Sequence, residues 1–385
     1  MKKVLLLLIT LGLTLLLPAC WNAKDIQNMA YVTALGLDYQ DGKYISYVQV
    51  LNFANVARTD TSQLGKTIPV WIGKGEGKTV TESFNSIYST SQIRVFWGHV
   101  RTIVCSESLL SNPQRIKEAY DMVNRYREIR YNVLLYGTKE PLKNIFVQKS
   151  ILNLSPLDTV MFSPSQVFSQ RSYVVPVYGY KVIAQFNELG DGAMMPSIAI
   201  DRKSWSEDKK LKGMLRIDGG YFFYNQNLRG WLSESDLRGY RWMQPRLERS
   251  PINIFDSDNH HPVAVIVIIH PKSKIKPYFK DGKVYFNISI RVQGYLDEFT
   301  DDLSEIELEE KAANQIKEEV RYSFKKGLQI RSDVLKLEEA LYRNYPKRFH
   351  ELKQDDELLI NEDSLKQIDV KVKLLHTGKY KGRGD

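Results

Sequence analysis

The sequence is poor in cysteine and histidine, and this limits the kinds of site that it can hold. Among its 385 residues are two cysteines, too few for a disulfide-dense scaffold or a cysteine-rich zinc protein. The six histidines show neither His-Glu-x-x-His nor another tight metal spacing, and adjacent His260 and His261 point different ways on a polar turn. We therefore predict no metal site.

The sequence also lacks the local motifs of common enzymes. It has no Gly-x-Ser-x-Gly elbow. A phosphate-binding loop needs a glycine five residues before its Gly-Lys-Thr end, but in the segment that ends at Thr79 this position is Ile72. Residues 73–79 are therefore expected to form a solvated Gly/Lys loop. The carboxylate pairs 301–302 and 309–310 lie on a charged helix face that is expected to be solvated. We predict no enzymatic activity and no cofactor.

The overall composition is that of a folded globular chain. Hydrophobic residues make up 43% and charged residues 26%, which excludes disorder, collagen-like repeats and coiled coil as the main architecture. The formal net charge is +9, and it falls to +7 without Lys2 and Lys3, because residues 1–19 contain no acid. A mild basic excess favours anionic surfaces but does not indicate a nucleic-acid partner.

The first twenty residues carry the strongest signal. Two lysines precede a nearly unbroken apolar run from Val4 to Leu17, too short for a transmembrane helix, which needs about 20 apolar residues. The pattern is typical of a secretory signal peptide over residues 1–19. Leu17-Pro18-Ala19-Cys20 resembles a bacterial lipobox, which implies cleavage before Cys20 and a diacylglyceryl group on its sulfur. The alternative is a plain signal peptide with a chance cysteine.

These features predict an extracytoplasmic chain that is tethered to a membrane at one end. Two or more acyl chains on one residue hold a protein stably at a bilayer, whereas one holds it marginally. Export makes a nucleic-acid partner or a cytosolic cofactor unexpected. If Cys20 is acylated, Cys105 has no disulfide partner, and its place in an apolar run predicts a buried, inert thiol rather than a reactive one.

The pattern of apolar residues predicts a multi-domain α+β protein, with mixed or antiparallel sheets and covering helices. Strands alternate with helices over residues 20–200, and a strand-rich part with a long helix at 301–326 follows over 213–376. Asn112-Pro113 predicts the start of one helix, and Ser332 is a candidate cap for another. Residues 201–212 are charged and lack a strand pattern, which predicts a linker, and 213–255 is a possible separate subdomain. Residues 377–385 are predicted to be a basic tail.

Several short motifs, in order, resemble the Ger(x)C lipoproteins of endospore-forming bacteria. The first is Cys-Trp-Asn-Ala-Lys-Asp-Ile at 20–26, followed by a strand that ends in Gly-Leu-Asp at 36–38. Trp-Gly-His at 97–99, Arg-Glu-Ile-Arg at 127–130 and Gly-Trp-Leu at 230–232 follow, and Leu-Arg-Gly at 237–239 and Tyr-Pro-Lys at 345–347 complete the set. Asn22 and Ala23 depart from the family pattern, as do Phe349 and the Asp355-Asp356 pair.

This resemblance implies a non-enzymatic subunit of a nutrient-germinant receptor with Ger(x)C N-terminal and C-terminal domain types. The subunit would be lipid-anchored on the outer face of the spore inner membrane and would assemble with integral-membrane A and B subunits. Direct contact with a small-molecule nutrient is left open. The motif residues that could take part in interactions are Trp97, His99, Arg130, Trp231 and Arg238. Their structural alternatives are core aromatics for the tryptophans and internal ion-pair partners for the arginines.

Two other functions remain as alternatives. A solute-binding lipoprotein of a transporter should have two similar α/β lobes with a hinge and a cleft, and the unlike halves of this sequence oppose that architecture. A cell-envelope hydrolase should carry a positioned nucleophile or metal set, and the sequence shows neither. The scattered Tyr and Trp residues are expected to serve the cores, with an aromatic ligand pocket as the alternative.

Overall fold

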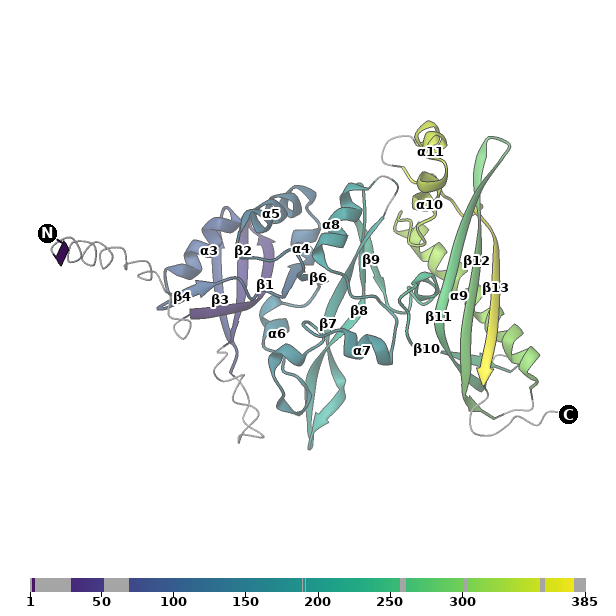
Figure 1. Ribbon diagram of the computed structural model, residues 1–385, viewed down its shortest axis with the longest axis horizontal. Helices are drawn as coiled ribbons and strands as arrows, with labels where there is room; N and C mark the ends of the chain where they lie inside the picture. Colours follow the sequence, from purple (N-terminus) through teal and green to yellow (C-terminus); the bar gives the residue numbers. More distant parts are fainter. Residues whose placement is uncertain are drawn as a thin grey trace.

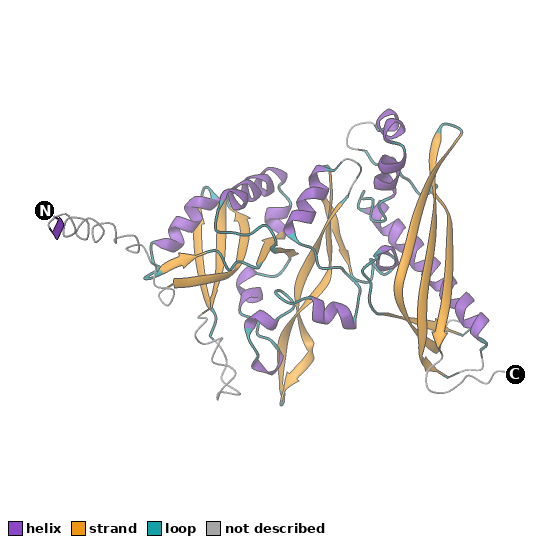
Figure 2. Cartoon of the chain, viewed as in Figure 1, coloured by secondary structure: helices purple, strands orange, loops and turns teal. Residues whose placement is uncertain are grey.

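The chain folds around two β-sheets that follow one another along its long axis (Figure 1). The computed structural model describes residues 2–3, 29–51, 69–188, 190, 192–256, 261–300, 303–353 and 357–376. Apart from Lys2 and Lys3, the predicted signal peptide lies outside these residues, as do Cys20 and the predicted tail 377–385. Helices lie against both sheets (Figure 2). The predicted α+β class, with mixed sheets and covering helices, is confirmed.

The first sheet has nine strands in the order β3-β2-β1-β5-β6-β7-β8-β9, with β4 paired to β1. The β1/β4, β1/β5, β5/β6 and β6/β7 pairs are parallel, and the other pairs are antiparallel. The strands are β1 (Met29–Gln40), β2 (Lys43–Leu51), β3 (Trp71–Gly77), β4 (Arg94–Phe96), β5 (Thr102–Ser106), β6 (Leu134–Thr138), β7 (Ala193–Glu207), β8 (Lys210–Tyr224) and β9 (Asn227–Ser233).

Helices cover both faces of this sheet. Buried side chains of α3, α4, α5 and α8 pack on one face, and α6 packs on the other, beside the segment 156–162. The helices are α3 (Val80–Tyr88), α4 (Glu107–Leu110), α5 (Pro113–Arg125), α6 (Leu142–Phe146), the 3₁₀ turns η4 (Ile151–Asn153) and η5 (Pro156–Asp158), α7 (Ser165–Gln170) and α8 (Gly179–Asn187). Asn112 caps α5 and Pro113 occupies its first turn, as the sequence predicts.

The second sheet has the order β10-β11-β12-β13. The long helix α9 crosses one face and buries its apolar stripe there, from Leu308 to Phe324. Strand β13 is parallel to β12, and this pairing requires the helical crossover between them. The elements are η6 (Tyr240–Met243), β10 (Ser250–Phe255), β11 (Pro262–Lys280), β12 (Lys283–Phe299), α9 (Glu305–Gln329), α10 (Leu337–Asn344), α11 (Pro346–Leu352) and β13 (Leu365–His376).

The predicted linker at 201–212 is wrong. These residues form the outer ends of β7 and β8, where Glu207 pairs with Lys210 around a tight turn. Nearly every side chain there is exposed, so no apolar alternation marks the strands; the backbone hydrogen bonds of the hairpin hold them instead. The predicted subdomain 213–255 is also wrong, because β8 and β9 belong to the first sheet and β10 to the second.

Two further local predictions fail. Residues 73–77 lie in strand β3, not in a solvated loop. A Cβ atom on Gly75 would lie 2.0 Å from the carbonyl oxygen of Ser83, so glycine there permits α3 to pack closely on the strand. Ser332 does not cap the helix that follows; α10 begins at Leu337, and the backbone N–H of Glu338 donates to Asp333 Oδ2 over 2.6 Å.

Candidate functional site

The nine-stranded sheet with its helices forms a first unit, and the four-stranded sheet with η6, α9, α10 and α11 forms a second unit. Trp97, the first of the motif residues, lies in the core of the first unit. Its indole stacks on Phe84 with ring centres 4.2 Å apart, and its Nε1 donates to Tyr88 Oη over 2.9 Å. Its backbone N–H donates to Glu128 Oε2 over 3.1 Å. Glu128 also pairs with Arg94, so Trp97 and Arg94 together fix the Arg-Glu-Ile-Arg segment at 127–130.

His99 and Arg130 lie close to this cluster at the surface. The exposed imidazole of His99 packs edge-on against the rings of Tyr31 and Phe96, with centroids 4.9 and 5.7 Å away. Partial burial, followed by the nearby charge of Arg130, lowers the pKa of His99 below its ordinary 6.5. The structure thus brings two motifs that are separated in sequence, Trp-Gly-His at 97–99 and Arg-Glu-Ile-Arg at 127–130, into one region.

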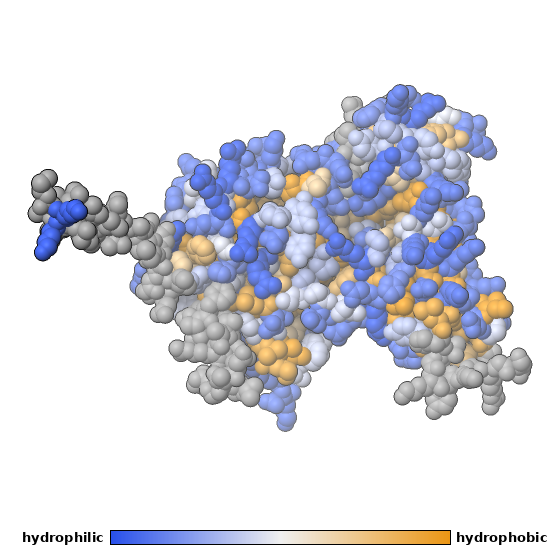
Figure 3. Space-filling view, viewed as in Figure 1, coloured by the Kyte–Doolittle hydropathy of each residue, from blue (hydrophilic) through white to orange (hydrophobic). Residues whose placement is uncertain are grey.

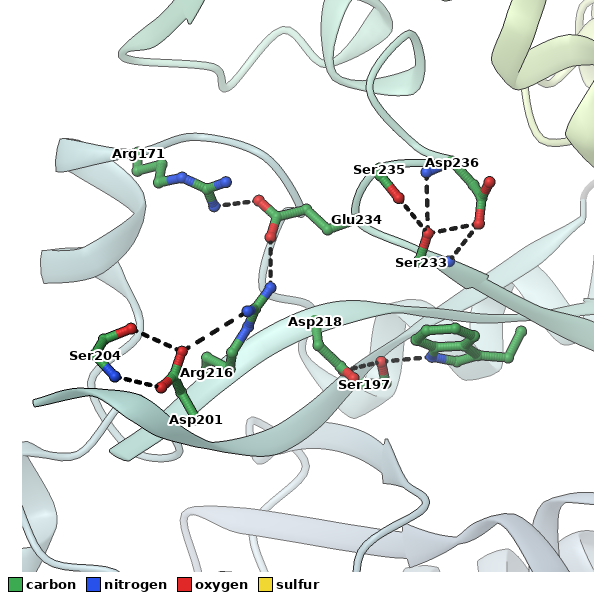
Figure 4. Close-up of polar contacts among 11 residues, drawn as sticks. Arg171, Ser197, Asp201, Ser204, Arg216, Asp218, Ser233, Glu234, Ser235 and Asp236 are labelled. Carbon is green, nitrogen blue, oxygen red and sulfur yellow. Dashed lines mark hydrogen bonds and ion pairs between the residues drawn. The ribbon is translucent and has the colours of Figure 1, made fainter. Parts of the chain in front are cut away.

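Trp231 lies on β9, far from that region along the sheet. Its Nε1 donates to Ser197 Oγ over 2.8 Å, and Ser197 Oγ donates to Asp218 Oδ1 over 2.5 Å (Figure 4). The ammonium of Lys139 lies 3.8 Å from the centre of the indole ring. Trp231 therefore joins β9 to β7 and β8 and is only partly buried.

A buried carboxylate, Glu234, lies beyond Trp231 and is held by two arginines. It pairs with Arg171, which follows α7, and its Oε2 lies 3.0 Å from Nη2 of Arg216 on β8 (Figure 4). Arg216 also lies 4.0 Å from Asp201, whose carboxylate accepts from the backbone and hydroxyl of Ser204. Sequence reasoning missed Glu234, because nothing local marks an acid between two distant arginines.

The segment that follows β9 connects the two units. Asp236 accepts from Ser233 Oγ over 2.5 Å and from Tyr322 Oη of α9 over 3.3 Å. The motif residue Arg238 makes no ion pair with a described residue, and its guanidinium lies 4.2 Å from the centre of the Tyr322 ring. A Cβ on Gly239 would lie 2.0 Å from the carbonyl oxygen of Glu319, so only glycine permits this approach of the chain to α9.

Two acids of the second unit are buried, and one of them bonds to the first unit. Glu319 on α9 pairs with Arg241 over 3.1 Å and accepts from Trp242 Nε1 over 2.7 Å. Glu338 on α10 accepts from Tyr224 Oη of β8 over 2.6 Å. Burial, followed by the charge of Glu338 and this hydrogen bond, raises the pKa of Tyr224. Both acids lie beside apolar helix positions, and their local sequence does not distinguish them from solvated ones.

A cavity of about 500 Å³ lies on the first unit, between α5 and α8. Its walls include Arg130 and Cys105. Burial raises the pKa of the Cys105 thiol to about 12, so this cysteine is protonated and a poor nucleophile at neutral pH.

The described part of the chain offers no arrangement for metal chemistry. There, no group of three His, Cys, Asp or Glu side chains is placed to hold a metal ion. Within those same ranges, the helices are too short or too polar to span a bilayer.

Comparisons with known proteins identify the family. Residues 22–200 match the family model described as "Spore germination protein N-terminal domain", and residues 218–378 match "Spore germination B3/ GerAC like, C-terminal". The chain is 23% identical over 376 residues to Spore germination protein KC of Bacillus subtilis (strain 168), which covers 91% of this chain and 90% of that protein.

Two further matches agree. Spore germination protein B3 of the same organism is 24% identical over 300 residues, covering 74% of this chain and 72% of that protein. The crystal structure of the GerBC protein shares the fold, with a TM-score of 0.53 and 17% identity over 91% of this chain and 100% of that chain. The motifs, the fold and the two consecutive domain matches lead to one conclusion: this chain belongs to the Ger(x)C family of spore germination proteins.

Proposed function

We propose that this chain is the lipid-anchored, non-enzymatic C subunit of a nutrient-germinant receptor. A diacylglyceryl group on Cys20 would hold it on the outer face of the spore inner membrane. It would assemble there with the integral-membrane A and B subunits. It would contribute to the receptor by contacting the other subunits close to the membrane, and it would need no cofactor.

The observation that carries this proposal is the match of two consecutive spore germination domains. They span residues 22–200 and 218–378, and therefore nearly all of the chain that follows the predicted leader. The predicted leader and its lipobox-like end support the anchor, since Cys20 would be the first residue of the processed chain and the first domain match begins at residue 22.

The joint between the units supports a role as one rigid body. Asp236 and Glu338 each accept a hydrogen bond across it, from Tyr322 and Tyr224 respectively, and Glu338 is buried. Separating the units would expose a buried charged group or remove its hydrogen-bond partner, and either change costs free energy. A subunit built in this way can transmit a displacement from one end to the other.

The alternative of a transporter's solute-binding lipoprotein is less well supported. Such a protein should close two similar lobes over a ligand in the cleft between them. Here the first unit is a nine-stranded mixed sheet and the second is a four-stranded sheet crossed by one long helix. The cavity near Arg130 lies within the first unit, not between the units.

Germination of spores that lack this chain tests the receptor role. Release of dipicolinic acid would be followed after single nutrients and, separately, after a non-nutrient trigger. We expect one nutrient response to be lost while the non-nutrient response is kept. Unchanged nutrient germination, in a strain without a redundant receptor, would contradict the proposal and favour the solute-binding alternative.

A Cys20→Ser variant tests the anchor separately. Without a thiol no thioether-linked lipid can form, so the chain should leave the spore membrane fraction. The Cys105→Ser variant is the matched control, because it removes the other cysteine and should leave the chain in the membrane fraction. Equal membrane retention of both variants would mean that the lipid on Cys20 is not the anchor.

A further inference from the structure

The helical layer over the first sheet is incomplete on one side. Val104 on β5 and Tyr136 on β6 face α6 and are 0% exposed. Their neighbours Ile103, Cys105 and Leu135 face α5 and α8, and they are 5%, 8% and 9% exposed, although they lie on central strands. The cavity of about 500 Å³ between α5 and α8 accounts for this difference, because it reaches down to the sheet.

The walls of this cavity combine an apolar interior with positive charge. The sheet residues and the inward faces of α5 and α8 supply apolar side chains, among them Ala119, Val123, Ile183 and Phe186. The charged residues that line it are Arg127 and Arg130. Neither arginine makes an ion pair with any residue that the structure describes.

Acids near the cavity are already paired elsewhere. Glu128 lies between the two arginines in sequence, but it binds Arg94 and the backbone of Trp97. Asp121 and Glu118 on α5 pair with Arg125 and Arg115, respectively. None of the residues that line the cavity is Asp or Glu, so the lining offers no carboxylate to a cationic ligand.

Tyrosines lie at the mouth of the cavity. Tyr131 is 77% exposed, and its ring is edge-on to that of Tyr180, with centroids 6.0 Å apart. Both line the cavity, and Tyr180 stacks on Tyr178 at the same centroid distance. Large aromatic rings held at a surface supply contact area for an apolar or aromatic ligand. The outer surface is otherwise largely polar on the face shown in Figure 3, where hydrophobic residues appear in separate groups.

From this arrangement we propose that the cavity binds a small monocarboxylate with an apolar or aromatic body. The body fills the space above β5 and β6, and the carboxylate lies against Arg127 and Arg130 at the rim. The volume falls within the range of about 300–1,000 Å³ that is usual for small-molecule sites. Guanidinium groups bind carboxylates with strong, directional hydrogen bonds.

The same chemistry disfavours other ligand classes at this site. A zwitterion such as an amino acid would bring an ammonium group that finds no carboxylate, and leaving a charge unpaired in a partly apolar site is unfavourable. A cationic ligand would in addition be repelled by the arginines. A neutral ligand would gain no ionic contact with the two guanidinium groups, which would stay exposed to solvent. The proposal concerns the cavity alone and does not depend on the receptor role.

Three compounds on one carbon frame test the charge requirement. Phenylpropionate, phenylalanine and phenylpropylamine would be titrated by calorimetry into the full chain reconstituted in lipid nanodiscs, and the heat from empty nanodiscs would be subtracted. We expect saturable binding of phenylpropionate, weaker binding of phenylalanine and none of phenylpropylamine. Equal binding of all three, or no saturable binding of phenylpropionate up to about 1 mM, would overturn the proposal.

Variants locate the binding in this cavity. The double substitution Arg127→Gln and Arg130→Gln changes exposed side chains and should weaken phenylpropionate binding about tenfold or more. Arg125→Gln, at the last residue of α5 and outside the cavity lining, should leave the affinity unchanged. Ala119→Trp should fill the cavity and abolish binding. If the double variant binds like the parent chain, the carboxylate does not lie between these arginines and the assignment is wrong.

Discussion

Arg241 and Glu319 form an ion pair inside the second unit, with Nη2 3.1 Å from Oε2 and both side chains almost fully buried. Trp242 Nε1 donates to the same carboxylate over 2.7 Å, and Arg241 Nη1 donates to Ser250 Oγ over 2.9 Å. The carboxylate of Glu319 thus holds α9 against η6, and Arg241 links this pair to β10. A buried pair of this kind makes the position of α9 intolerant of the loss of either partner.

Replacing Glu319 by glutamine should therefore destabilise the chain strongly. The change keeps the side-chain shape but leaves Arg241 as a buried charge without a counter-ion, which costs about 3–5 kcal/mol of unfolding free energy. Urea titration measures the loss. Glu318→Gln is the control, because Glu318 is exposed on the same helix turn and should change stability by no more than about 0.5 kcal/mol. Equal losses in the two variants would show that the buried pair contributes nothing.

A cut at the tip of the β7–β8 hairpin should not separate the two halves of the chain. Trypsin is expected to cleave at Lys209 or Lys210, where the side chains are exposed at the turn. Because β7 and β8 pair along most of their length within one sheet, the two fragments should stay associated. They should elute together in native size exclusion and separate on a denaturing gel. Separate elution of the fragments would instead indicate a linker.

The carboxyl group of Glu118 should give stability that depends on acid pH. Hydrogen bonds from Tyr44, Arg115 and Gln114 lower its pKa from 4.5 to about 2. A carboxyl group with a lower pKa in the folded chain binds fewer protons there than when unfolded, so it stabilises above its unfolded pKa. This contribution is lost as the pH falls through the interval from 4.5 to about 2.

Melting temperatures of the parent chain and of Glu118→Gln, measured over a range of pH, test this loss of stability in acid. The parent should melt higher near neutral pH, and the difference should shrink as the pH is lowered into that interval. Asp121→Asn is a useful comparison, since Asp121 lies on the same helix and its pKa is lowered mainly by the hydrogen bond from Arg125. A difference between the parent and Glu118→Gln that grows with acid would contradict the assignment.

Three cations lie side by side on neighbouring strands of the second sheet. Arg291 on β12 is directly opposite Lys272 on β11 and Lys371 on β13. Like charges directly opposite one another destabilise a sheet. Arg291→Gln should therefore raise the unfolding free energy by about 0.2–1 kcal/mol. The gain should shrink at about 1 M salt, where screening acts within about 3 Å.

Lys274→Gln is the matched control for this row. Lys274 is opposite Ser289, whose other neighbour is Asp369, so its row is not purely cationic. The gain from Lys274→Gln should be smaller than that from Arg291→Gln at low salt. A loss of stability in Arg291→Gln would mean that the packing of its side chain outweighs the repulsion.

Local patterns in the sequence are enough to place most helices and strands. The turns at Asp41-Gly42 and Asp281-Gly282 have positive φ at both residues, as tight hairpins require. The stripe from Leu308 to Phe324 predicts α9, although the helix begins at Glu305 and ends at Gln329 instead of spanning the expected 301–326. The motifs around Trp97 and Trp231, together with the leader, are local in sequence, and they indicate the family by themselves.

Tertiary structure decided what local patterns cannot encode. The outer hairpin at 201–212 has no buried face, so its strands follow from backbone pairing and not from hydrophobic alternation. The partners of Glu234, Glu319 and Glu338 come from distant segments, and an isolated acid in a sequence looks the same whether it is solvated or buried. The cavity exists because two helices leave a gap over β5 and β6. The sequence by itself determined most of the helices and strands and indicated the family; the three-dimensional packing alone decided which charges are buried together and where the surface is open.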